Sequence, residues 1–248
     1  MVGCKPVATL NEKFQREYGS GDADESVYRS LVGSLLYLTT TRPDIMYAAS
    51  LLSRFMHKPT CIRYGAPKRI LRYIQGTLDF GIMYERNVEP KLYGFCDSDW
   101  GGNVDDLKST SGYTFTLGTG VFSWASKKQK SVALSTAEVE YVLVSIATSQ
   151  VVWLRRIMQD FGEKQESATH ILCDNKSAIA MSKNPVCHSK SKHIALKHHF
   201  IRGSVEDKEV DVLYYKTEDQ VADIFTKALP KDKFIYLREL FGNEAAKH

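Results

Sequence analysis

Two short apolar segments end in the same way, with an aspartate directly after a cysteine. Asp97 follows Cys96, and Asp174 follows Cys173. If the two segments are parallel neighbouring strands, about 4.8 Å apart, their carboxylates lie side by side at the carboxyl edge of a sheet, where open α/β folds place their sites. Adjacent carboxylates repel each other unless one is protonated or a divalent cation such as Mg²⁺ binds both. Each aspartate alone is explained by a helix cap or a turn, but the pair predicts a metal site.

A predicted helix that begins near Thr136 carries two further acids, Glu138 and Glu140. At 100° per residue, Glu140 faces the apolar side of this helix and Glu138 does not. Glu138 also completes a capping box with Ser135, so it already has a structural role. A carboxylate on the packed side of a helix is costly unless it is paired or bound to a metal. We therefore predict that Glu140, and not Glu138, is the functional acid.

A fourth acid, Asp223, lies in a segment that we predict to be a helix over residues 218–229, capped by Thr217. The apolar stripe of that helix points away from Asp223. The pattern alone therefore favours a solvated surface acid at this position, comparable to Asp99 and Asp219.

Two parts of the chain differ in the period of their apolar residues. From residue 26 to residue 77 the period is helical, and we expect three helices. The dipeptide Arg42–Pro43 separates the first helix from the second, Asp44 caps the second, and the third covers residues 62–75. We predict a small all-helical module.

After Gly76 the period changes to two, which is typical of strands. The segment that ends at Asp97 is apolar on both faces, so we expect it in the centre of its sheet. Strands and helices then follow in an order that predicts one mixed α/β domain of about 160 residues. The expected strands are residues 91–97, 112–117, 121–126, 170–174 and 209–215, and the expected helices are 136–161, with or without a break before its end, 175–182, 193–206 and 218–229.

The composition is that of a globular chain. Of 248 residues, 43% are hydrophobic and 25% are charged, which argues against a disordered, collagen-like or coiled-coil protein. The apolar runs are too short to span a bilayer and the N-terminus has no apolar signal segment, so we expect no membrane partner and no secretion. The five cysteines are scattered, without a Cys-x-x-Cys pair, and fit a reducing intracellular setting.

Basic residues are concentrated in two places. Residues 28–87 carry nine basic and three acidic side chains, and a solvated helical surface and a nucleic-acid surface are equally good explanations. A second basic segment contains Cys187 and several histidines, but their spacing fits no standard zinc ligand set, so we favour contact with phosphates. The candidate nucleic-acid contacts are Lys68, Arg69 and Arg72 in the first place and Lys190, Lys192 and Lys197 in the second.

Short motifs spread along the chain carry a family resemblance. They are YRSLVGSLLYL at 28–38, TRPDI at 41–45, KRILRYIQGT at 68–77, DSDW at 97–100, KSTSGY at 108–113, VALS at 132–135, AEVEY at 137–141, CDN at 173–175, KHI at 192–194, TEDQ at 217–220 and ADIFTK at 222–227. Together they closely resemble the C-terminal part of the Pol polyprotein of copia-type LTR retrotransposons.

This resemblance implies a division of the chain and a fold. Residues 1–25 correspond to the tail of a reverse-transcriptase palm and residues 26–87 to a thumb or connection module. Residues 88–230 correspond to a ribonuclease H-like domain, a mixed five-stranded α/β sheet with flanking helices, and residues 231–248 to a C-terminal helix and tail.

The resemblance also implies a reaction, which is hydrolysis of the RNA strand of an RNA–DNA hybrid by two Mg²⁺ ions, with Mn²⁺ as a substitute. Ribonucleases H place one acid on the first strand, one on the first helix, one at the end of the fourth strand and one on the last helix. The corresponding catalytic and metal-binding residues are Asp97, Glu140, Asp174 and Asp223. Ser98, Asn175 and the backbone near Glu140 are the candidates for sensing the 2′-hydroxyl groups of the RNA strand.

The chain also departs from the family pattern. Residues 200–222 contain no histidine, although many ribonucleases H carry one before the last acid, and no Tyr-x-Asp-Asp polymerase motif occurs. We therefore expect no polymerase activity without a separate palm and fingers, which are implied partners. The expected location is a cytoplasmic retrotransposon particle or the nucleus.

Two other functions remain open at this stage. One is a catalytically silent or co-opted fragment that only binds nucleic acid. The other is an integrase-like polynucleotidyl transferase, although the acids of such enzymes follow the order Asp, Asp, Glu, and Glu140 precedes Asp174 here.

Overall fold

The computed structural model describes residues 3–10, 21–61, 63–101, 108–129, 135–183 and 192–245, with backbone only for residues 192–198. The chain divides into two compact units. The helical unit comprises residues 1–83 and 227–248, and the sheet unit comprises residues 84–226. The C-terminal segment, which we expected to stand apart, is thus part of the helical unit.

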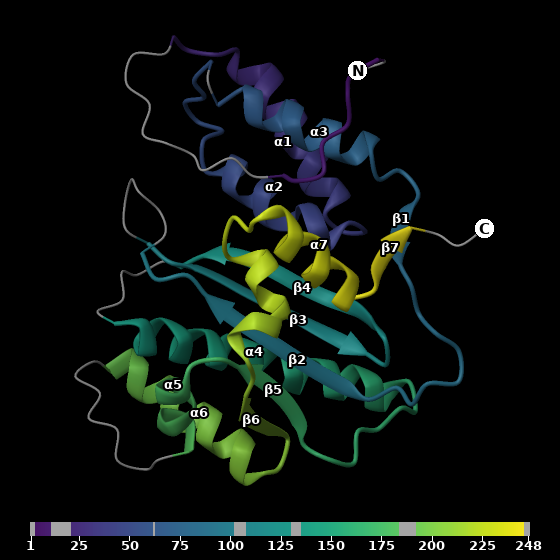
Figure 1. Cartoon of the computed structure of the whole chain (residues 1–248). Helices are drawn as coiled ribbons and strands as arrows, with labels where there is room; N and C mark the ends of the chain where they lie inside the picture. Colours follow the sequence, from purple (N-terminus) through teal and green to yellow (C-terminus); the bar gives the residue numbers. More distant parts are fainter. Residues whose placement is uncertain are drawn as a thin grey trace. The chain divides into compact units, whose positions relative to one another are not determined.

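The helical unit contains the three expected helices, the third of which begins three residues later than predicted. A fourth helix from the C-terminal segment and a small antiparallel strand pair, which the sequence pattern does not indicate, complete the unit (Figure 1). The elements are α1 (Glu25–Leu38), η1 (Pro43–Ile45), α2 (Met46–Ser53), α3 (Gly65–Gln75), β1 (Phe80–Ile82), α7 (Lys231–Leu240) and β7 (Asn243–Ala245).

Asp44 does not cap α2 as predicted. It lies in the short helix η1 and is 1% exposed, and its carboxylate accepts hydrogen bonds from Arg42 Nε at 2.9 Å and Arg42 Nη2 at 2.7 Å. The hydroxyl of Tyr73 donates to Asp44 Oδ2 at 2.6 Å and accepts from Arg238 Nη1 at 3.1 Å. Because these side chains come from η1, α3 and α7, this buried ionic network ties three elements of the helical unit together.

The sheet unit is built on five strands in the order β4-β3-β2-β5-β6. The first three pair antiparallel, and β2 pairs with β5, and β5 with β6, in parallel. This arrangement confirms the predicted mixed five-stranded sheet, with the strand that ends near Asp97 in its centre. The strands are β2 (Leu92–Ser98), β3 (Thr110–Leu117), β4 (Gly120–Lys128), β5 (Thr169–Cys173) and β6 (Val210–Tyr214).

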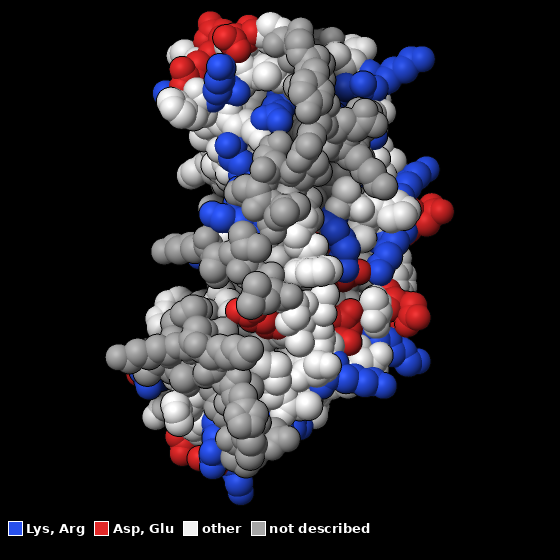
Figure 2. All heavy atoms as spheres, turned by 90° about the vertical axis from the view of Figure 1, so that its left-hand side faces the viewer, with Lys and Arg blue, Asp and Glu red and all other residues white. Residues whose placement is uncertain are grey.

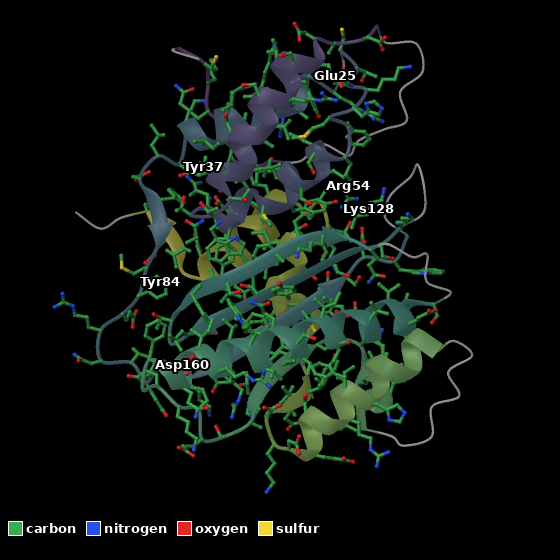
Figure 3. All side chains as sticks on the ribbon, turned by 180° about the vertical axis from the view of Figure 1, so that it is seen from behind. Glu25, Tyr37, Arg54, Tyr84, Lys128 and Asp160 are labelled. Carbon is green, nitrogen blue, oxygen red and sulfur yellow. The ribbon has the colours of Figure 1, made fainter. Side chains whose placement is uncertain are left out.

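Three helices pack together and α4 lies against the sheet, as the view from behind shows (Figure 3). They are α4 (Thr136–Asp160), α5 (Lys176–Lys183) and α6 (Lys192–Glu206). In Figure 3, Lys128 marks the end of β4 on the side where α4 begins, and Asp160 marks the opposite end of α4. Buried side chains between the sheet and the helices form the core, among them Leu92, Cys96, Phe115, Tyr141, Val144, Ile171 and Val212.

The helix predicted over residues 218–229 is wrong, because this segment forms two short 3-10 helices, η2 (Thr217–Asp219) and η3 (Val221–Phe225). The helix predicted over residues 136–161, for which a break was left open, is a single uninterrupted element of 25 residues.

By length and composition, α4 is the one helix among the described residues that could cross a membrane. Polar side chains interrupt its apolar positions, so it contains no long uninterrupted apolar run. Of its most apolar window, 61% is buried inside the sheet unit, so the apolar side chains of α4 form the protein core.

Candidate metal centre

The register of β2 and β5 brings the two Cys-Asp pairs together. Cys96 is paired with Cys173 across the parallel strands, so Asp97 and Asp174 are the next residues on neighbouring strands. Asp97 is 3% exposed, and Asp174 is half-buried. The two strands are therefore parallel neighbours, which meets the condition under which the sequence predicts a shared site.

Glu140 reaches this edge of the sheet from the second turn of α4. The helix begins as predicted, with Ser135 Oγ accepting a hydrogen bond from Glu138 N at 3.2 Å. Glu140 is 4% exposed, and its Oε1 accepts from the backbone N–H of Ser98 at 2.9 Å. Its Oε2 accepts from the thiol of Cys173, with 3.8 Å between the oxygen and Sγ. The predicted burial of Glu140 is therefore confirmed, and Glu138 is only half-buried.

Glu140, Cys173 and Asp174 form a compact donor set. One ligand atom from each lies within 4.8 Å of the ligand atoms of the other two. Two carboxylates and a thiol at this separation are suited to a single divalent cation, and carboxylate oxygens are the ligands that Mg²⁺ uses in proteins. The residues present therefore fit a metal ion.

Asp97 and Asp223 meet on the other face of β2, through Thr226. The hydroxyl of Thr226 donates to Asp97 Oδ2 and lies 3.2 Å from the backbone carbonyl oxygen of Asp223. Asp223 is 1% exposed, so the surface position favoured by the helical pattern is wrong. The reason is that η3 is a 3-10 helix packed on β2 and β3, and a periodicity of 3.6 residues does not describe it.

A glycine allows η3 to approach the sheet this closely. Gly112 is the β3 partner of Asp97, and a Cβ atom at Gly112 would lie 2.7 Å from Phe225 Cβ and 2.7 Å from Thr226 Cγ2. Any larger residue would push the segment away from Asp97. Gly112 and Thr226 are the positioning residues that the sequence analysis missed, although both lie within quoted motifs.

The electrostatics of the site oppose a negative charge on Glu140. Burial raises the pKa of its carboxyl group well above the ordinary value, and the charges of Cys173, Asp97 and Asp174 raise it further. The hydrogen bond from the Ser98 N–H acts in the opposite direction. No lysine or arginine forms an ion pair with Glu140 among the described residues. A bound cation would favour the ionised form.

The two cysteines form a short chain of hydrogen bonds that leads to Glu140. The hydrogen bond between the two thiols is the largest cause of the pKa shift of each. It raises the pKa of Cys96 and lowers the pKa of Cys173, as expected if Cys96 is the donor. Cys173 in turn donates to Glu140, and its Sγ also accepts from the backbone N–H of Asn175 at 3.5 Å. Both cysteines are fully buried.

The polar side chains next to the acids have internal partners. Ser98 Oγ donates to the carbonyl oxygen of Thr110 at 3.1 Å. Asn175 Oδ1 accepts from the backbone N–H groups of Ser177 and Ala178, each at 3.0 Å, and so caps α5. The helix cap that was an alternative role for Asp174 is thus supplied by Asn175.

The basic candidates of the helical unit have different surroundings. Lys68 is exposed, with Nζ 4.9 Å from the Tyr64 ring centroid. Arg69 and Arg72 are half-buried and donate to the backbone carbonyl oxygens of Thr9 at 3.2 Å and Lys5 at 2.7 Å. The structure thus corrects the view that both arginines are available for phosphate, because their guanidinium groups hold the N-terminal segment.

The remaining basic candidates lie outside the described side chains. These are Lys190, Lys192 and Lys197. Figure 2 shows the face toward which β2 points. Acidic side chains reach the surface of the sheet unit on this face. Lysine and arginine side chains are spread over the surface of the helical unit.

The sheet unit is a mixed five-stranded α/β sheet with flanking helices, and predicted acids lie at the end of its central parallel strands. The chain is 42% identical over 237 residues to the "Retrovirus-related Pol polyprotein from transposon RE2" of Arabidopsis thaliana, which covers 94% of this chain and 16% of the relative. The chain is also 40% identical over 252 residues to the "Retrovirus-related Pol polyprotein from transposon TNT 1-94" of Nicotiana tabacum. This match covers 98% of this chain and 19% of the relative.

The chain is thus similar over nearly its whole length to retrotransposon Pol polyproteins, and it spans less than a fifth of the length of these relatives. No family model matches it. A solved structure of LC11-RNase H1 in complex with an RNA/DNA hybrid is similar with a TM-score of 0.41 and 11% identity, over 55% of this chain and 94% of the other.

Proposed function

We propose that the sheet unit is a metal-dependent nuclease that hydrolyses the RNA strand of RNA–DNA hybrids. One observation carries this proposal: ligand atoms of Glu140 and Asp174, from α4 and from the end of β5, lie within 4.8 Å of each other, next to the neighbouring strand that carries Asp97. Similarity to retrotransposon Pol polyproteins supports the choice of a hybrid as substrate.

We propose Mg²⁺ as the metal, with Mn²⁺ as a substitute. Asp97, Glu140, Asp174 and Asp223 would hold two ions, which supply an activated water and stabilise the leaving oxygen. The protein's own contribution is positional. Thr226 orients the carboxylate of Asp97, and the Ser98 N–H orients that of Glu140. Burial of these acids removes bulk water, which strengthens every electrostatic interaction at the site.

We assign the minor-groove contacts of the hybrid to Ser98 and Asn175. Asn175 Oδ1 is committed to the α5 cap, so the amide nitrogen is the group we assign to a 2′-hydroxyl. Lys68 is our candidate for a phosphate contact in the helical unit, since its side chain is exposed. The separate palm and fingers of a Pol polyprotein are proposed partners.

A labelled RNA–DNA hybrid tests the proposal. The full chain should cleave the RNA strand when Mg²⁺ is present, and Asp97→Asn should lower the rate on the order of a thousandfold, since metal stabilisation of the transition state supplies several kcal/mol. Glu138→Gln is the control, because it removes an acid from the first turn of α4, two residues before Glu140, without touching the donor set, and it should retain full activity.

The same experiment separates the competing functions. Equal activity of Asp97→Asn and the unaltered chain would reject the proposal. Binding of the hybrid without cleavage in Mg²⁺ or Mn²⁺ would favour a silent nucleic-acid-binding fragment. Joining of double-stranded DNA ends would favour a polynucleotidyl transferase.

A further inference from the structure

The donor set at the metal centre contains a sulfur atom, which a magnesium site does not require. Mg²⁺ is a hard cation that takes oxygen ligands, whereas thiolates select softer ions such as Zn²⁺ and Cd²⁺. Cys173 lies directly between its neighbour Cys96 and Glu140, and it is fully buried. The sulfur atom of Cys173 is therefore close enough to Glu140 to bind the same ion.

We propose that Cys173, Glu140 and Asp174 form a binding site for a thiophilic divalent cation such as Zn²⁺, and that occupation by this ion blocks the magnesium-dependent reaction. The inference rests on the proposed function for the reaction that is blocked, but the binding site itself does not depend on it.

The distances suit a zinc ion. Tetrahedral zinc, with bonds of about 2.3 Å to sulfur and 2.1 Å to oxygen, holds the two donor atoms about 3.6 Å apart. The observed separation of Cys173 Sγ and Glu140 Oε2 is 3.8 Å. Asp174 supplies a third donor within 4.8 Å of both, and a water molecule would complete the four ligands, as in zinc sites with three protein ligands.

The surroundings favour the charged forms of these ligands once a cation is present. Glu140 is only 4% exposed, and it forms no ion pair with lysine or arginine in the described part of the chain. The N–H of Asn175 points at Cys173 Sγ from 3.5 Å and stabilises a thiolate, as partners of metal-bound thiolates do. Asp174 is half-buried, so an ion can enter from its side.

Binding involves no change of oxidation state. The S–H bond of Cys173 breaks, its proton leaves to solvent water, and a bond forms between sulfur and the metal. Cys96 keeps its proton, because its sulfur lies behind Cys173 and is not part of the donor set. The two cysteines therefore make a matched pair for an experiment, since both are fully buried and they share one register position.

Cd²⁺ is the probe, because its bond to a thiolate gives an ultraviolet charge-transfer band that reports sulfur ligation without any activity measurement. The protein is the full chain with Cys4, Cys61 and Cys187 replaced by serine, so that only Cys96 and Cys173 remain. Titration should give one thiolate per bound Cd²⁺. The band should persist in Cys96→Ser and disappear in Cys173→Ser. The affinity of Cys173→Ser for Cd²⁺ should be lower by about tenfold or more.

Asp174→Asn is a second variant, chosen because a half-buried side chain tolerates substitution. It should weaken Cd²⁺ binding while keeping the band at saturation. If Cys173→Ser fails to fold, the band in the parent protein and in Cys96→Ser still decides the question. Absence of the band in the folded parent, or its loss in Cys96→Ser with retention in Cys173→Ser, would overturn the inference.

Hybrid cleavage in Mg²⁺ then tests the block. Zn²⁺ near one equivalent should inhibit the parent, and Cys173→Ser should need at least about ten times more. Inhibition at the same Zn²⁺ concentration in both would overturn the blocking step. A charge-transfer band in a protein that never cleaves hybrid would reject the proposed function and leave the thiophilic site standing.

Discussion

The two units bury charged groups in different ways. In the helical unit, the buried carboxylate of Asp44 is neutralised by two hydrogen bonds from Arg42 and a third from Tyr73. In the sheet unit, the buried carboxylate of Glu140 receives a backbone N–H and a thiol from the described residues, and Asp97 receives the hydroxyl of Thr226. The first arrangement is complete as it stands, and the second is suited to receive a cation. The partners of a buried acid, more than its burial, thus separate a structural role from a functional one.

The largest effect should come from neutralising Glu140. Glu140→Gln keeps the shape of the side chain and should lower hybrid cleavage on the order of a thousandfold, because one ligand of the metal loses its charge. The same change should leave the metal-free fold at least as stable as before, since burial disfavours the charged form of Glu140 and glutamine carries no charge. Cleavage rates and urea unfolding without metal measure the two effects. A stable protein with unchanged activity would contradict the functional assignment.

Breaking the network of the helical unit should cost stability and little activity. Asp44→Ala leaves the buried guanidinium of Arg42 without its partner, a change that typically costs about 3–5 kcal/mol. All three tryptophans, at positions 100, 124 and 153, lie in the sheet unit. Far-ultraviolet circular dichroism should therefore show an early helical transition while tryptophan fluorescence keeps its midpoint. Simultaneous early transitions by both probes would contradict independent stabilities of the two units.

A smaller effect is expected from Thr226→Val, which preserves shape and removes the hydroxyl that orients Asp97. A hydrogen bond to a charged group contributes about 1.5–3 kcal/mol, so hybrid cleavage should fall by about tenfold to a hundredfold. Thr226→Ser restores the hydroxyl and should recover most of the rate. Equal losses in the valine and serine variants would indicate a packing role instead.

The smallest effect concerns pH and metal. Because the folded-state pKa of Glu140 is raised, its protonated form stabilises the fold at low pH. This contribution is fully present below the ordinary pKa of 4.5 and decreases as the pH rises toward the raised folded-state pKa. Thermal unfolding of metal-free protein should show this loss, and Mg²⁺ or Glu140→Gln should reduce it. An identical pH dependence in Glu140→Gln would assign it to other groups.

The local patterns predicted most of the sheet unit and part of its site. The short apolar runs before the two Cys-Asp endings were enough to predict β2 and β5, because a strand buried on both faces is apolar along its length. Their parallel pairing was a condition of the predicted site and depends on the whole sheet. The packed side of α4 was enough to choose Glu140 over Glu138. These are signals that a single element carries within its own residues.

The errors arose where tertiary contacts override local preference. Asp44 follows a helix break, as a helix-capping residue often does. Its carboxylate instead accepts hydrogen bonds from the guanidinium of Arg42 and the hydroxyl of Tyr73. Asp223 was placed on a surface because the segment was read with a helical period, whereas packing against Gly112 holds it as a 3-10 turn. The contacts of Arg69 and Arg72 with the N-terminal segment likewise depend on residues about 60 positions away.

The pairing of β1 with β7 has a consequence for how the protein is made. The helices α1 to α3 are synthesised before the sheet unit, yet their unit also includes α7 and β7, which follow the sheet unit in the chain. Phe234 of α7 packs against Tyr73 of α3, with 5.8 Å between the ring centroids. During translation, the packing of the helical unit is therefore completed only after all residues of the sheet unit have been synthesised.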